Sequence, residues 1–252
     1  MTEPLVRTSS TDGVYTIMLA RPAKRNAVSD RLLAALEKAW DAMPQDCRAV
    51  ILAGEGGHFC AGLDLSEHQH REPFAVMRHS QGWQRVFSKI QMSGTPVICV
   101  LQGAVIGGGL ELATATHVRV AEPSAIYQLP EGRHGIFVGG GASVRVARII
   151  GAGRMCEMML TGRVYDAAEG QQLGLSHYLV AAGAGMAKAR ELAGRIAENT
   201  PMANYAMVTA VQRISNMSAD DGFFVESLAA GLTQTSPEIV ERIGSFLKGK
   251  RG

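Results

Sequence analysis

The sequence contains no long run of apolar residues, no extended basic cluster and no closely paired cysteines. A helix that crosses a membrane needs about 20 consecutive, mostly apolar residues, so we expect no such helix and no membrane partner. The densest basic group, residues 248–251, is a short tail that we expect to be solvated, so we expect no nucleic-acid partner. The four cysteines lack CxxC spacing, which argues against a zinc site or a disulfide framework.

The N-terminal segment also lacks the pattern of a secretory signal, in which basic residues precede a short apolar core. We therefore expect a cytoplasmic protein whose cysteines are reduced thiols. The chain does contain 46% hydrophobic residues over 252 positions, which is enough for one large domain with a buried core. Its formal net charge of +2 favours no particular class of partner.

Short apolar segments alternate with amphipathic ones over the first three quarters of the chain. We expect strands near 14–19, 48–53, 96–102, 117–121, 125–128 and 178–180, and helices near 30–43, 73–92, 141–150, 153–160 and 166–173, with a further apolar helix ending near 116. Ser29 is a good N-cap for the helix over 30–43. From about residue 184 the pattern is helical alone, and Asn199-Thr200-Pro201 interrupts it. The sequence thus predicts an α/β body over residues 1–197 and a helical C-terminal region over residues 198–252.

Two of the apolar strands are followed by glycine-rich loops, at 54–65 and 103–109. Glycine lets a ligand approach the backbone closely, and a helix that begins after such a loop leaves its first N–H groups without partners. Two loops of this kind that face each other can direct two N–H groups at one oxygen, here those of Leu63 and Gly108. Removing one donor from such an oxyanion hole typically costs about 3–4 kcal/mol of transition-state stabilisation. The alternative is two tight turns in a packed α/β domain.

Two glutamates lie in glycine-containing segments, typical of turns, that directly follow apolar runs. Glu111 follows the run 96–101 and its glycines, and Glu131 lies in Leu-Pro-Glu-Gly after the run 125–127. Two carboxylates in one cleft can hold and activate a water molecule, and in a partly dry site they titrate as a coupled pair. A single glutamate in an unknown fold is more often an ordinary cap or turn carboxylate, so the interpretation depends on the pair.

Four ordered motifs carry a resemblance to a known family: RPAKRNA at 21–27, FCAGLDL at 59–65, GAVIGGGLEL at 103–112 and PEG at 130–132. In order and spacing they resemble the crotonase family, which comprises the enoyl-CoA hydratases and isomerases. The likeness covers essentially the whole chain. It implies an α/β fold in which strand-strand-helix turns wind into a spiral. It also implies C-terminal helices that assemble a homotrimer, or a hexamer built as a dimer of trimers.

The same resemblance implies a role for each candidate residue. The N–H groups of Leu63 and Gly108 would bind the thioester carbonyl of an acyl-CoA substrate and stabilise its enolate. Glu111 would orient and help to deprotonate a water molecule that adds to Cβ of a 2-enoyl thioester, and Glu131 would donate a proton to Cα. The implied activity is that of an enoyl-CoA hydratase. No separate cofactor is implied, because coenzyme A is part of the substrate.

A surface for coenzyme A is implied as well. Lys24 and Arg25 are the candidates for its phosphates, although lone surface cations are about as often only solvated. Backbone groups near four further residues are expected to contact the adenine and the pantetheine: Ala23, Ala61, Asp64 and Leu65.

Other activities stay open from the sequence. An enoyl-CoA isomerase can work with the Glu131 carboxylate alone, a lyase can follow hydration with retro-aldol cleavage, and a non-catalytic subunit can bind acyl-CoA. Many family members have a proline-containing turn after the second glutamate, whereas this chain has Gly-Ile-Phe-Val-Gly at 135–139, so the preferred acyl group is open. We expect His68 and His70 to belong to a polar loop near the substrate entrance, not to a metal site. We expect Cys60 to pack and not to act as a nucleophile.

Overall fold

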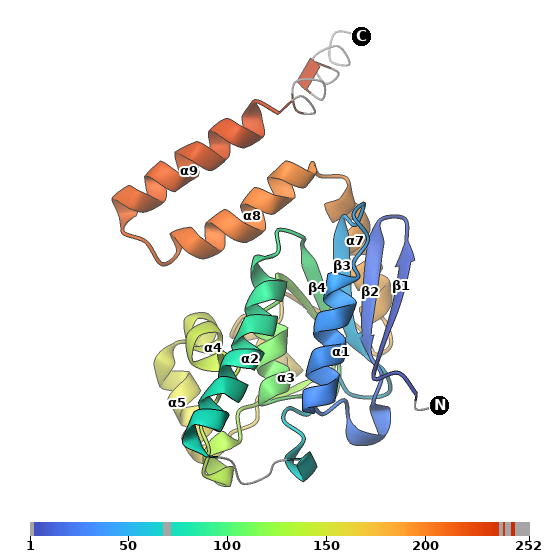
Figure 1. The fold of residues 1–252 in the computed structure, drawn as a ribbon, viewed down its shortest axis with the longest axis vertical. Coiled ribbons are helices and arrows are strands. Elements are labelled where there is room, and N and C mark those ends of the chain that lie inside the picture. The colour runs from blue at the N-terminus through green and yellow to red at the C-terminus, as the bar shows by residue number, and fades with distance from the viewer. Residues whose placement is uncertain (1–2, 68–71, 237–238, 240–242, 245–252) are drawn as a thin grey trace.

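The computed structural model describes residues 3–67, 72–236, 239 and 243–244, and its chain path is drawn in Figure 1. No helix within these residues is long and apolar enough to span a membrane. The polar segment with His68 and His70 lies outside the described residues, as do most residues after 236.

Six strands form the main sheet, in the order β1-β2-β3-β4-β6-β8. Their bounds are β1 Val6–Thr11, β2 Val14–Leu19, β3 Ala49–Gly54, β4 Val97–Leu101, β6 Val118–Ala121 and β8 Tyr178–Leu179. Only the β1–β2 pair is antiparallel, and the other pairs are parallel. Parallel strands in the middle of a sheet are covered on both faces, which is why β3 and β4 are continuous apolar runs with every residue buried.

The side chains of β3 alternate between two cores, as the period of a strand requires. Val50 and Leu52 belong to the larger core, and Ile51 and Ala53 belong to a smaller one. Helices α1 (Asp30–Asp41) and α2 (Pro73–Met92) supply side chains to the larger core, and α7 (Gly185–Ala197) supplies them to the smaller one. Figure 1 shows α1 and α2 in front of the sheet and α7 behind it.

A second, two-stranded sheet extends the spiral beyond the main one. Strand β5 (Ala104–Ile106) begins just after β4 and pairs in parallel with β7 (Ile126–Gln128). It is followed by α3 (Gly108–Thr114), so β4, β5 and α3 form one strand-strand-helix turn. An isolated bridge between Cys60 and Val105 joins the first glycine-rich loop to this small sheet. The two glycine-rich loops are therefore neighbours in space.

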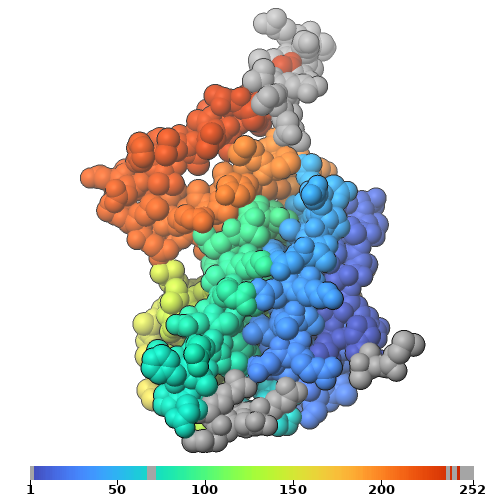
Figure 2. Space-filling model, viewed as in Figure 1, coloured from blue at the N-terminus to red at the C-terminus, as the bar shows by residue number. Residues whose placement is uncertain are grey.

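The remaining helices complete the body and the C-terminal region: α4 Ala142–Ile150, α5 Ala152–Thr161, α6 Ala167–Gln172, α8 Pro201–Ile214 and α9 Ala219–Gln234, with 3-10 turns η1 Pro22–Lys24, η2 Leu65–Glu67 and η3 Glu131–His134. Helices α8 and α9 contact each other and form a hairpin that projects from the body (Figures 1 and 2). The division into 1–197 and 198–252 stays a prediction.

Two strands were missing from the sequence-based expectation. Strand β1 is polar and mostly exposed, so it carries no hydrophobic alternation. Its signal was the dipeptide Asp12-Gly13, whose φ values of 51° and 73° match a two-residue hairpin turn. Strand β5 lies inside the segment that we had interpreted as a glycine-rich loop. The predicted cap of α1 is confirmed, because the Ser29 hydroxyl accepts a hydrogen bond from the Leu32 N–H (3.1 Å).

Candidate active site

One cavity of about 470 Å³ is bordered by four of the predicted site residues: Leu63, Gly108, Glu111 and Glu131. The rest of its wall comes from α2 and from the segment between η3 and α4. These lining residues are Val76, Met77, His79, Ser80 and Trp83 on α2, and Ile136, Phe137, Val138, Gly139 and Gly140 after η3. Apart from His79, Ser80 and the two glycines, these residues have apolar side chains.

The strand-like pairing of Leu63 with Val28 leaves the Leu63 N–H pointing away from Val28. Leu63 forms an isolated parallel bridge with Val28. In this bridge the Val28 N–H donates to the Gly62 carbonyl (2.7 Å), and the Asp64 N–H donates to the Val28 carbonyl (3.0 Å). Both polar groups of Val28 are thus used by the residues on either side of Leu63. The Leu63 N–H has no hydrogen-bond acceptor within the described part of the chain.

Gly108 is the first residue of α3, so its N–H has no acceptor inside the helix. The preceding cap, Gly107, has a φ of 51°, a conformation that favours glycine. The first glycine-rich loop, which contains Leu63 and is called the Leu63 loop below, comes close to the start of α3. A Cβ atom on Gly62 would lie 2.7 Å from the Ile106 carbonyl oxygen and 3.2 Å from the Gly108 nitrogen. Glycine at position 62 is therefore required for the approach of the two loops.

Glu111 is fixed by backbone donors. It lies on α3 and is 3% exposed. Its Oε1 accepts hydrogen bonds from the N–H groups of Gly140 (2.8 Å) and Ala142 (3.0 Å). Burial raises the pKa of the Glu111 carboxyl, while these two N–H groups and the nearby positive charge of Arg145 act in the opposite direction. The carboxylate thus has one oxygen anchored.

Glu131 is held far less tightly. It is the first residue of η3 and is 8% exposed. Its Oε2 is buried and has no hydrogen-bond partner among the described residues. Burial raises the pKa of Glu131 to about 7, and the negative charge of Glu111 adds to this effect. A buried carboxyl with a free oxygen and a pKa near neutrality can hold or release a proton at the cavity wall.

The residues predicted for CoA binding belong to two segments that contact each other, residues 23–25 and 61–65. Lys24 and Arg25 are exposed, and Ala61 donates its N–H to the Arg25 carbonyl (2.9 Å). Leu65 is 48% exposed. Ala23 is exposed on η1. Contact of these residues with coenzyme A stays a prediction.

Asp64 is buried, and its side chain is already used within the protein. Its carboxylate lies 2.6 Å from the Arg21 guanidinium. It also accepts hydrogen bonds from the Ser66 hydroxyl (2.6 Å) and the Ser66 N–H (3.0 Å). The hydrogen bonds of Ser66 and the charge of Arg21 lower the pKa of Asp64. Since the Asp64 N–H is also used, by the Val28 carbonyl, a backbone contact of Asp64 with coenzyme A would come from its carbonyl and stays a prediction.

Sequence reasoning missed the part of the site that comes from α2. A Cβ atom on Gly108 would collide with the indole ring of Trp83, so this ring packs directly on the start of α3. The sequence predicted a helix near 73–92, but nothing in its pattern indicated that Trp83 makes this contact. Cys60 is buried, and burial raises the pKa of its thiol to about 12, which agrees with a packing role. No group of three potential metal ligands occurs among the residues that the structure describes.

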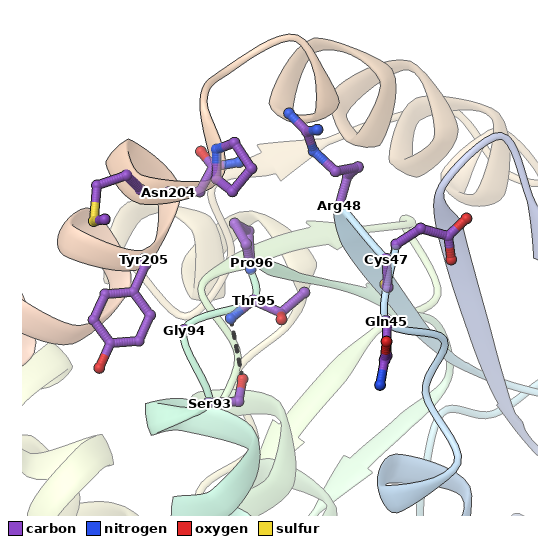
Figure 3. A pocket seen from close by; sticks show the side chains of 12 residues that line it. Gln45, Cys47, Arg48, Ser93, Gly94, Thr95, Pro96, Asn204 and Tyr205 are labelled. Atoms are coloured by element: carbon purple, nitrogen blue, oxygen red, sulfur yellow. Dashed lines mark hydrogen bonds between the residues drawn. The ribbon is translucent and has the colours of Figure 1, made fainter. Parts of the chain in front are cut away.

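A second cavity, of about 600 Å³, lies at the base of the C-terminal hairpin (Figure 3). Its lining comes from residues 45–48, from residues 93–96 and from the first turn of α8. Tyr205 of α8 lies close to Gly94 there, because a Cβ atom on Gly94 would collide with the Tyr205 ring. None of the predicted site residues is among its described lining residues.

The fold and the paired carboxylates define a crotonase-type protein, and comparison with known proteins identifies the family. Residues 9–247 match the model of the enoyl-CoA hydratase/isomerase family. The chain belongs to this family. Enoyl-CoA hydratase EchA19 of Mycobacterium tuberculosis is 33% identical over 216 residues, which are 84% of this chain and 81% of that protein. Enoyl-CoA isomerase/hydratase fer4 of Mycosarcoma maydis is 31% identical over 225 residues, 85% of this chain and 82% of that protein.

Solved structures confirm the predicted fold class. A protein of Rhodopseudomonas palustris that is provisionally named an enoyl-CoA hydratase is 50% identical, with a TM-score of 0.96 over 100% of this chain and 98% of its own. The enoyl-CoA hydratase of Bacillus anthracis is 29% identical, with a TM-score of 0.91 over 97% of this chain and 96% of its own. The α/β spiral with a helical C-terminal region is therefore the fold of this chain.

Proposed function

We propose that this protein is an enoyl-CoA hydratase that adds water across the 2,3 double bond of a 2-enoyl-CoA thioester. The observation that carries the proposal is that one cavity is bordered by two carboxylates and by two residues whose N–H groups have no acceptor among the described residues. The named hydratases among the relatives support it. Membership of the family agrees with an acyl-CoA substrate, and coenzyme A enters as part of that substrate.

In the proposed reaction, the N–H groups of Leu63 and Gly108 bind the thioester oxygen. A water molecule between the two carboxylates adds its oxygen to Cβ, and its proton passes to Glu111. The electron pair of the double bond moves through Cα to the thioester oxygen, where the enolate is stabilised by the two donors. The enolate then returns its electrons to Cα, which takes a proton from Glu131. A net proton transfer from Glu111 to Glu131 restores the starting state.

The different environments of the two carboxyls support this division of roles. Glu111 has one oxygen fixed by Gly140 and Ala142, so its other oxygen has a defined direction for a water molecule. Glu131, with an unpartnered Oε2 among the described residues and a pKa that burial raises to about 7, can carry a proton at neutral pH. A proton donor and a proton acceptor are thus available together.

The experiment is to follow the loss of ultraviolet absorbance of conjugated 2-enoyl-CoA thioesters with short, long and aromatic acyl groups. Wild type, Glu131→Gln and Glu111→Gln are assayed in parallel. Rapid loss with wild type and little loss with either variant is the expected result, and the rates rank the acyl groups. Binding of every thioester with no loss of absorbance would contradict the proposal and would favour a non-catalytic binding subunit.

An isomerase is the second candidate, because one relative carries both activities in its name. Isomerisation of a 3-enoyl thioester can proceed with one carboxyl that moves a proton from Cα to the far end of the double bond. Appearance of conjugated product from a 3-enoyl-CoA that persists in Glu111→Gln would favour this function. Cleavage to an aldehyde with an aromatic thioester would instead favour the hydratase/lyase.

We also propose that the C-terminal hairpin mediates assembly into a homotrimer or a dimer of trimers. Helices α8 and α9 expose large apolar side chains that a monomer would leave in water: Met207, Val211, Phe223, Phe224, Leu228 and Leu232. Exposed apolar patches of this kind mark interfaces in soluble proteins. Light scattering on the purified protein distinguishes a trimer and a hexamer from a monomer, and a monomer would contradict the proposal.

A further inference from the structure

A buried arginine holds the loop that fixes Glu111. Arg145 lies on α4 and is 8% exposed. Its Nη1 donates to the Gly140 carbonyl (2.9 Å), and its Nη2 donates to the Ser88 hydroxyl (2.9 Å). Its Nε donates to Gln91 Oε1 (2.7 Å). Within the described chain no carboxylate lies at ion-pair distance from this guanidinium, so it is held by neutral acceptors.

Gly140 is the link between Arg145 and the carboxylate. Its N–H donates to Glu111 while its carbonyl accepts from Arg145. The next residue, Gly141, has a φ of 111°, and a Cβ atom there would collide with Arg145 Nη1. The loop thus closes tightly over the guanidinium and presents two N–H groups, those of Gly140 and Ala142, to Glu111. Displacement of Arg145 would release the loop that anchors the carboxylate.

The network continues to the C-terminal hairpin. Gln91, at the end of α2, accepts from Arg145 through Oε1 and donates through Nε2 to Gln212 Oε1 on α8 (3.1 Å). The Gln91 carbonyl lies 3.0 Å from His117 Nε2, which fixes the end of α2 from a third side. A continuous chain of hydrogen bonds therefore runs from Glu111 through Gly140, Arg145 and Gln91 to α8.

We propose that Arg145 is a positioning residue for hydration, which fixes the loop that holds Glu111, and that Gln91 and Gln212 tie this loop to α8. This inference rests on the proposed function. It gives the C-terminal hairpin a role in the geometry of the site, since movement of α8 is transmitted through two side-chain amides. Arg145 is not among the described residues that line the cavity, so it acts on the reaction through the Gly140 loop and the Glu111 carboxylate that this loop holds.

The charge of Arg145 gives the proposal a signature in pH. The charged groups that face Glu111 are Arg145 from α4 and Glu131 from η3, and three N–H groups of residues 140–142 also contribute. Burial and the negative charge of Glu131 both raise the pKa of Glu111. When the charge of Arg145 is removed, only the N–H groups oppose this effect, so the pKa of Glu111 rises further. Because Glu111 must be ionised to accept a proton, the acid limb of the kcat profile moves to higher pH.

The test compares Arg145→Met and Arg145→Lys with Arg148→Met, an exposed arginine on the same helix. We expect kcat of Arg145→Met to fall by about 2- to 30-fold, the size of effect found for residues that influence a site through a network of contacts, with KM unchanged. The acid limb should shift only in Arg145→Met, because Arg145→Lys keeps the charge but loses the fork of donors. Arg148→Met should resemble wild type in all three quantities. Unchanged kcat and an unchanged acid limb in Arg145→Met would overturn the proposal.

A measurement without substrate separates this inference from the proposed function. The carboxyl carbon of Glu111 is followed by NMR during a pH titration of ¹³C-labelled protein, with Glu111→Gln assigning the signal. A higher titration midpoint in Arg145→Met than in wild type supports the positioning role even if no thioester is hydrated. Equal midpoints would overturn it even if hydration is confirmed. If Arg145→Met fails to fold, Arg145→Gln, which also removes the charge, provides the same comparison.

The connection to α8 has its own variant pair. Gln212→Leu removes the amide that contacts Gln91, and Arg213→Met changes its exposed neighbour on the same helix. We expect a kcat loss of about twofold or more in Gln212→Leu alone, at unchanged oligomeric state. Equal kcat values for the two variants would show that α8 does not influence the site.

Discussion

Glu111 and Glu131 border the same cavity, but their carboxyls are held in different ways. Two N–H groups anchor Glu111 Oε1, whereas Glu131 Oε2 is buried with no described partner. Burial raises both pKa values, and that of Glu131 reaches about 7. This asymmetry is what a hydration reaction needs, because one group must direct water while the other exchanges a proton with carbon.

The first prediction concerns Glu131→Gln. The amide keeps the shape of the side chain but cannot donate a proton, so we expect kcat to fall by about 10²- to 10⁴-fold with a small change in KM. Steady-state kinetics on a conjugated 2-enoyl-CoA measures both. Glu226→Gln, which changes an exposed glutamate on α9, is the control and should retain full activity. Wild-type kcat in Glu131→Gln would remove Glu131 from the mechanism.

Glu131 should also lower stability as the pH rises. Its carboxyl keeps its proton up to about pH 7 when folded but releases it near pH 4.5 when unfolded. Between these values the folded protein binds more protons than the unfolded chain, so the free energy of unfolding falls with rising pH. The shift corresponds to roughly 3 kcal/mol in total. The full loss of stability is reached only above about pH 7.

Urea unfolding at pH 5 and pH 8 measures this effect by difference. Glu131→Gln has no titrating group at this position, so its stability relative to wild type should increase between the two pH values. We expect Glu131→Gln to be the more stable protein at pH 8, by about 1–3 kcal/mol. Glu226→Gln again provides the reference. A constant difference between Glu131→Gln and wild type would mean that Glu131 does not titrate in this range.

Gly108→Ala tests the oxyanion donor without changing charge. The new Cβ atom would collide with Trp83, so either the ring or the first turn of α3 must move. If the turn moves, the Gly108 N–H loses its direction, and we expect kcat/KM to fall by about 10²-fold or more. Trp83→Leu combined with Gly108→Ala makes room for the methyl group and should recover part of the loss. Gly153→Ala is a control on α5 with open space around it.

Some features could be predicted from the sequence because they are local. The apolar runs of β3 and β4 and the Ser29 cap depend on neighbouring residues, and the structure confirms them. Glu111 and Glu131 were found because each lies in a short motif. Their common cavity followed only from the resemblance, since no pattern in one chain places two segments face to face.

Contacts between distant segments could not be predicted. The α2 pattern indicates which side chains of this helix are buried, but the angle at which the helix crosses α3 decides that Trp83 covers Gly108. From the sequence alone, Arg145 cannot be distinguished from any other arginine on an amphipathic helix. Its acceptors, Ser88, Gln91 and the Gly140 carbonyl, come from two separate elements. Strand β1 shows the same limit at a sheet edge, where polar residues pair without an apolar pattern.

The last prediction concerns Lys24 and Arg25, which are exposed next to the Leu63 loop. If these cations bind the phosphates of coenzyme A, replacing both with methionine removes attraction that acts equally on bound substrate and transition state. KM for a 2-enoyl-CoA should then rise by about 3- to 30-fold, because an exposed ion pair contributes roughly up to 1 kcal/mol. The effect should shrink at high ionic strength, where exposed charges are screened.

The same acyl group on a thioester that ends at pantetheine lacks the nucleotide phosphates, so the double variant and wild type should use it equally well. Lys38→Met, which changes an exposed lysine on α1, is the control for loss of surface charge. An equal rise of KM for both thioesters would mean that the two cations support the fold of η1 and do not contact the nucleotide.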